Sequence, residues 1–125
     1  MCNERLRRIA IADASPAFLT AAANYIAALP GYVLAGTADT AMQAPALVTS
    51  AGPDVLLVDL GRPSAPGLEI VKRVKSAPGA PAVVAMTLFH TPEAAAAAQH
   101  AGADALVSKE SFVAGLSLAL ARLFP

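Results

Sequence analysis

The sequence predicts an α/β fold in which a parallel sheet carries helices on both faces. Three features predict it: the length of 125 residues, a regular alternation of apolar runs with helix signals, and runs that are apolar throughout. A chain of this length can bury one sheet between two helix layers. A continuously apolar run is typical of a parallel strand covered on both faces. Because a helix-length connection follows each run, we expect a doubly wound parallel sheet.

Five segments are predicted as strands. The clearest lies within DVLLVDLGRPSAPG, residues 54–67, where the apolar run ends on the carboxylate of Asp59 before a loop rich in glycine and proline. Ligands of open parallel sheets collect at the carboxyl ends of strands, so an acid at this point is placed for chemistry. The predicted strands are Leu6 to Ala12, Tyr32 to Ala38, Val55 to Asp59, Ala82 to Thr87 and Ala105 to Val107.

Capping signals place a helix after each strand. Ser15 and Thr91 each precede a proline, a pattern typical of an N-cap with proline at the first helical position. Pro45 leaves the start of the second helix open, because proline is tolerated only in the opening turn. The predicted helices are Ser15 to Leu29, Asp39 or Thr40 to Ala51, Pro66 or Gly67 to Ser76, Thr91 to Ala101, and Ser111 to Leu123. Gly102 is the expected residue after the fourth helix.

Composition narrows the class of protein. Charged residues make up only 14% and apolar residues 56%, yet no apolar segment reaches the length of a bilayer span. The nine basic and nine acidic residues cancel, which leaves no global field to attract nucleic acid or membrane. Cys2 is the single cysteine, and the start of the chain is charged rather than apolar, so we expect a cytoplasmic protein.

Polar side chains follow four of the predicted strands. Asp13 follows the first strand, Asp59 ends the third, Thr87 ends the fourth and Lys109 lies just past the fifth. In the strand order 2-1-3-4-5 the first, third and fourth strands are neighbours where the order reverses, so we expect these side chains to meet in one crevice. Each residue alone has an ordinary surface or turn interpretation. The hypothesis of a site depends on their convergence.

These residues, in this order, resemble the receiver domain of bacterial two-component response regulators. The resemblance extends from Arg7 to Leu123, so we expect one receiver domain over residues 1–125. The match consists of Asp59 with Pro63 and Gly67 at the expected offsets, together with the other three polar residues named above. The segment IADASPAF and the pair Lys109-Glu110 look most like the subfamily that carries a LuxR-type DNA-binding domain, which this chain lacks. The resemblance implies a flavodoxin-like sheet of five parallel strands, order 2-1-3-4-5, with five helices.

The resemblance also assigns roles. Asp59 is the expected phosphoacceptor, Thr87 the switch hydroxyl and Lys109 the lysine that pairs with the phosphoryl group. Carboxylates can attack phosphorus when a cation offsets the charge. Mg²⁺ prefers oxygen ligands and keeps several waters, so Asp13, Asp59 and the backbone carbonyl of Gly61 are the expected protein ligands.

Two positions depart from the family pattern. Ala14 stands where a second acid is expected, and this predicts weak Mg²⁺ binding. Leu106, three residues before Lys109, replaces the aromatic ring whose inward movement usually couples the site to the outer face. Leu106 is therefore expected to be a weaker relay.

The predicted function is a non-enzymatic receiver that takes a phosphoryl group from a sensor histidine kinase onto Asp59 and changes its affinity for a partner, in signalling that could regulate transcription. The alternative is a receiver-like binding module that works without efficient phosphorylation. An enzyme or flavin protein is less favoured, because Asp59-Leu60-Gly61 lacks the Asp-x-Asp pattern of phosphatases and Asp13 would face a flavin phosphate.

Apolar residues of the last predicted helix spread wider than one core-facing stripe: Phe112, Val113, Leu116, Leu118, Leu120, Leu123 and Phe124. Some must face outward, which predicts a homodimer or partner contact through this helix. Met42 and Met86 are assigned to the core. No contact with nucleic acid or membrane is expected of this chain itself.

Overall fold

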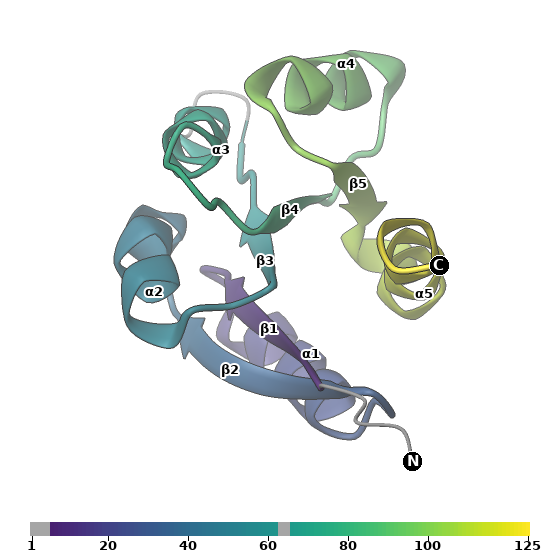
Figure 1. Cartoon of the computed structure of the whole chain (residues 1–125). Coiled ribbons are helices and arrows are strands. Elements are labelled where there is room, and N and C mark those ends of the chain that lie inside the picture. The colour runs from purple at the N-terminus through teal and green to yellow at the C-terminus, as the bar shows by residue number, and fades with distance from the viewer. Residues whose placement is uncertain (1–5, 63–65) are drawn as a thin grey trace.

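The computed structural model describes residues 6–62 and 66–125. Five strands form one parallel sheet in the order β2-β1-β3-β4-β5, as the sequence predicts (Figure 1). The strands are β1 (Arg7–Ala12), β2 (Tyr32–Ala38), β3 (Val55–Asp59), β4 (Ala82–Thr87) and β5 (Ala105–Ser108). Within the described residues, no helix is long and apolar enough to cross a membrane.

Two helix layers cover the sheet (Figure 1). The helices are α1 (Pro16–Ala27), α2 (Ala44–Ala51), α3 (Gly67–Lys75), α4 (Pro92–Ala101) and α5 (Phe112–Leu123). On one face, α1 and α5 pack over a cluster that includes Ile9, Leu57 and Met86. On the other, α2, α3 and α4 pack over a cluster that includes Leu56 and Val83. Successive side chains of a strand point to opposite faces, so each continuously apolar strand feeds both cores.

Capping chemistry accounts for the helix ends. Ser15 Oγ accepts from the Phe18 N–H at 3.4 Å, and Thr91 Oγ1 accepts from the Ala94 N–H at 3.0 Å, as expected of N-caps. Gly102 follows α4 with φ 105°, a left-handed conformation that favours glycine. The two predicted N-caps and the predicted terminator of α4 are thereby confirmed.

The second helix differs from the prediction. A 3-10 helix, Ala41–Gln43, precedes α2, and Thr40 makes no side-chain capping bond to it. The α-helix begins only at Ala44, which puts Pro45 in the opening turn where its missing N–H costs nothing. The prediction that Asp39 or Thr40 caps one continuous helix is therefore wrong.

Smaller differences concern the last helix and one methionine. A second 3-10 helix, Lys109–Ser111, separates β5 from α5, so α5 starts one residue later than predicted. Met86 is fully buried, but Met42 is 63% exposed on the 3-10 helix and its assignment to the core is wrong. Val113 and Leu118 are 53% and 58% exposed, which confirms that α5 presents apolar side chains outward.

Candidate functional site

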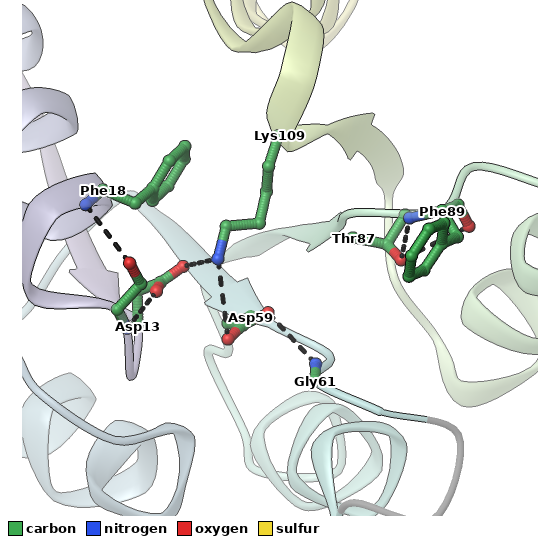
Figure 2. Close-up of polar contacts among 8 residues, drawn as sticks. Asp13, Phe18, Asp59, Gly61, Thr87, Phe89 and Lys109 are labelled. Atoms are coloured by element: carbon green, nitrogen blue, oxygen red, sulfur yellow. Dashed lines mark hydrogen bonds and ion pairs between the residues drawn. The ribbon is translucent and has the colours of Figure 1, made fainter.

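Four predicted side chains lie at the carboxyl end of the sheet, and three of them, Asp13, Asp59 and Lys109, are in contact. Asp13 follows β1, Asp59 ends β3, Thr87 ends β4, and Lys109 begins the 3-10 helix after β5. Figure 2 shows the Lys109 side chain reaching between Asp13 and Asp59, while Thr87 lies beyond Asp59 on the side away from Asp13. The strand order produces this arrangement, because β1 and β4 both flank β3.

Asp13 is the most enclosed member of the site. It is 0% exposed, its Oδ1 accepts from the Ser15 N–H at 2.8 Å, and its Oδ2 lies 2.8 Å from Lys109 Nζ. That second contact is an ion pair of short distance but poor direction, since Oδ2 has no hydrogen bond of acceptable geometry among the described residues. A buried carboxylate oxygen in this condition retains lone pairs for a further ligand.

Asp59 is more accessible. Its side chain is 15% exposed; Oδ1 accepts from the Gly61 N–H at 3.0 Å, and Oδ2 lies 3.8 Å from Lys109 Nζ. Gly61 has φ 70°, a conformation that glycine adopts without strain and that turns its N–H back to the carboxylate. Because attraction falls with distance, Lys109 is held more strongly by Asp13 than by Asp59.

Lys109 is nearly enclosed, with 7% of its side chain exposed. Besides the two carboxylates, its Nζ lies 4.5 Å from the centroid of the Phe18 ring. A cation over an aromatic face is attracted by the electron density of the ring. The sequence alone did not predict this contact. The only signal was the position of Phe18 in the first turn of the helix that follows Asp13.

Thr87 has its hydroxyl engaged with the loop after β4. Oγ1 accepts from the Phe89 N–H at 3.2 Å and lies 3.4 Å from the Phe89 carbonyl oxygen, to which it can donate (Figure 2). Thr87 itself is 7% exposed, whereas the neighbouring Leu88 and Phe89 are 55% and 77% exposed. The hydroxyl thus lies next to the site but is bound to a loop that projects into solvent.

The remaining predicted positions are also located. Ala14 is exposed and Leu106 is partly buried. Gly67 is buried, and a Cβ there would lie 2.3 Å from the Leu60 carbonyl oxygen, so only glycine lets α3 approach the loop after Asp59 this closely. Pro63 lies outside the described residues.

Comparison with known proteins identifies the fold and the family. Residues 9–120 match the model of the response regulator receiver domain. The chain belongs to this family. Receiver domains are signalling domains and generally not enzymes. A Pseudomonas aeruginosa protein provisionally named a transcriptional regulator is 29% identical over 114 residues, which are 91% of this chain and 55% of the relative. The chain therefore spans about half the length of that relative.

Solved receiver structures agree with this assignment. A LuxR-family two-component response regulator from Aurantimonas sp. SI85-9A1 superposes with a TM-score of 0.84 at 28% identity, covering 95% of this chain and 85% of the other. A LuxR-family DNA-binding response regulator from Staphylococcus aureus gives 0.82 at 22% identity, with 94% of this chain and 98% of the other covered. At that lower identity the likeness concerns the fold alone.

Proposed function

We propose that this receiver domain, residues 1–125, accepts a phosphoryl group from a sensor histidine kinase onto Asp59 and thereby changes its affinity for a partner protein. One observation carries the proposal: the partly exposed Asp59 carboxylate ends β3 beside Lys109, which lies 3.8 Å away. A carboxylate at the rim of the sheet is open to a phosphodonor, while the ammonium beside it can stabilise the added negative charge.

The transfer is a substitution at phosphorus. A carboxylate oxygen of Asp59 attacks the phosphoryl group of a phosphohistidine, an O–P bond forms, the P–N bond breaks, and the electron pair returns to the imidazole nitrogen. Lys109 balances charge on the product. Thr87 leaves the Phe89 backbone to hydrogen-bond the phosphoryl oxygens, and the loop after β4 changes position.

Receiver domains typically bind Mg²⁺ in an acidic pocket, and the residues here fit such an ion. Among the residues that the structure describes, the buried Asp13 Oδ2 has no hydrogen bond, and Asp13 and Asp59 face the same lysine ammonium. These two carboxylates and the Gly61 carbonyl would hold the cation, which when bound neutralises charge on the phosphoryl oxygens. The proposed ligands include only two carboxylates, because Ala14 is neutral, and this supports weak binding with several retained waters.

The proposed partners are the kinase and a second protein that contacts α5. Leu118 and Val113 give this helix an exposed apolar surface, and a second copy of the chain is the simplest occupant. Regulation of transcription is proposed from the P. aeruginosa relative, whose length exceeds that of this chain. We place the protein in the cytoplasm, where a kinase would reach it.

The test is incubation with acetyl phosphate and Mg²⁺, followed by intact-mass measurement. Wild type is expected to gain one phosphoryl group, and Asp59→Asn to gain none. Asp39→Asn removes an exposed acid outside the site and should keep the adduct. An adduct that persists in Asp59→Asn would place the phosphorylated residue elsewhere and overturn the proposal.

A second candidate function is a receiver-like module that binds a partner without efficient phosphorylation. It is favoured by the neutral Ala14 and by the position of Lys109, 2.8 Å from Asp13 but 3.8 Å from Asp59. Absence of any adduct with acetyl phosphate and with several kinases would support this alternative.

A further inference from the structure

We propose that Phe18 is a positioning residue for phosphoryl transfer to Asp59, because its ring holds the Lys109 ammonium between the two carboxylates. The inference rests on the proposed function, since it concerns the same site. Nζ lies 4.5 Å from the ring centroid, and only 7% of the lysine side chain is exposed. Cation–π attraction is strongest where water is excluded, as it is here.

Lys109 needs a third contact to fix its position. A lysine ammonium is a point charge on a flexible four-carbon chain, unlike the planar fork of arginine. Its 2.8 Å contact with Asp13 lacks hydrogen-bond direction, and Asp59 is 3.8 Å away. Ala14 supplies no carboxylate. The Phe18 ring therefore restricts the ammonium from a third direction, beside Asp13 (Figure 2).

Two kinds of contact position Phe18, one through its ring and one through its backbone. Phe18 packs edge to face on Phe112 of α5, with ring centroids 5.2 Å apart and an interplanar angle of 81°. Its backbone N–H donates to Ser15 Oγ, and the Ser15 N–H donates to Asp13 Oδ1. The aromatic and the anionic partner of Lys109 thus belong to one capped turn at the start of α1. This local unit fixes the distance between them before any phosphodonor arrives.

Tyr25 provides a matched control. It lies on the same helix and also packs edge to face on Phe112, at 6.1 Å between centroids and 76° between planes. Within the described residues, the aromatic ring that contacts the Lys109 ammonium belongs to Phe18 and not to Tyr25. Tyr25→Leu therefore removes a ring from the same aromatic cluster and leaves the cation–π contact in place, whereas Phe18→Leu removes both kinds of interaction.

The experiment compares wild type, Phe18→Leu, Phe18→Tyr and Tyr25→Leu. Proton NMR of the Lys109 ε-methylene group reports the ring-current shift that an aromatic face induces. Acetyl phosphate kinetics then separate the maximal rate of Asp59 modification from the half-saturating donor concentration. Phe18→Leu is expected to lose the shift and to slow the maximal rate roughly threefold to tenfold. Phe18→Tyr, which keeps a ring, and Tyr25→Leu should keep both the shift and the rate.

Two results would overturn the inference. One is an ε-methylene signal in wild type that matches Phe18→Leu, which would mean that no ring lies over the lysine. The other is an equal loss of rate in Phe18→Leu and Tyr25→Leu, which would assign Phe18 to packing alone. If Asp59 takes no phosphoryl group in any variant, the proposed function fails, while the ring-current shift still decides whether Phe18 holds Lys109.

Discussion

The two sides of the site differ in how firmly their side chains are held. On the β1 and β5 side, the buried Asp13 lies 2.8 Å from the nearly enclosed Lys109 ammonium, which the Phe18 ring covers. On the β4 side, Thr87 bonds a loop whose next residues, Leu88 and Phe89, are more than half exposed. The side chains of one side are enclosed, whereas the threonine on the other side is attached to an exposed segment.

Under the proposed phosphorylation of Asp59, this difference would divide charge stabilisation from signalling between the two sides of the site. Groups that stabilise charge work best when they are fixed before the reaction, because no reorganisation is then required. A switch needs two arrangements of similar free energy, which an exposed loop held by weak hydrogen bonds can supply. In the proposed reaction, Asp13 and Lys109 would stabilise the charge of a phosphoryl group on Asp59, and Thr87 with its exposed loop would report the change.

The largest expected effect comes from removing the Lys109 ammonium beside the buried Asp13. Lys109→Met leaves Asp13 buried without its partner, and loss of one member of a buried ion pair costs about 3–5 kcal/mol. Urea denaturation at neutral pH should show a loss of this size. Lys72→Met is the control, because Lys72 is 50% exposed beside Glu69 and should cost less than ~1 kcal/mol. Equal stability of the two variants would mean that Lys109 does not compensate Asp13.

A smaller effect is expected from adding the missing acid. Ala14→Asp raises the number of carboxylates at the rim, so Mg²⁺ binding should tighten about tenfold and phosphorylation should speed up. Without metal, the added repulsion should lower the melting temperature. Isothermal titration with Mg²⁺ measures the first effect, and Ala17→Asp, an exposed position in the first turn of α1, controls for charge alone. Equal Mg²⁺ affinities of wild type and Ala14→Asp would show that another ligand already takes the place of the missing acid.

The smallest effect on the site is expected from a substitution on the exposed surface of α5, which belongs to neither side of the site. Leu118→Gln should change the free energy of unfolding by less than ~0.5 kcal/mol and leave phosphorylation unchanged, yet weaken self-association. Sedimentation velocity at high protein concentration, with Thr49→Gln on α2 as the control, checks this. A wild-type protein that stays monomeric, with and without a phosphoryl mimic, would contradict a homodimer through α5.

Most of the fold follows from local patterns in the sequence. Continuous apolar runs with Ser-Pro and Thr-Pro caps specify strand and helix positions, because burial on both faces and N-cap hydrogen bonds are short-range requirements. The second helix differs from the prediction because Pro45 permits a 3-10 helix before it. Both the 3-10 helix and α2 pack against α3, a tertiary contact that local signals do not reveal. Met42 was misplaced along with the 3-10 helix.

The site could be predicted only in part. A topological rule places Asp13, Asp59, Thr87 and Lys109 at one end of the sheet, because they follow strands that are neighbours in the predicted order. The same rule does not say which carboxylate Lys109 approaches, that Phe18 covers it, or that Thr87 bonds the Phe89 backbone. These contacts depend on side-chain rotamers and on differences of about 1 Å between elements far apart in the chain.

The contrast between a fixed and a movable side is tested most directly by backbone amide NMR during phosphorylation of Asp59. The Phe89 amide donates to Thr87 Oγ1, and the Ser15 amide donates to Asp13 Oδ1, so each reports one side of the site. With Mg²⁺ present throughout, acetyl phosphate is expected to shift the Phe89 signal more than the Ser15 signal. A phosphorylated protein in which the Phe89 signal stays in place while the Ser15 signal moves would contradict the account.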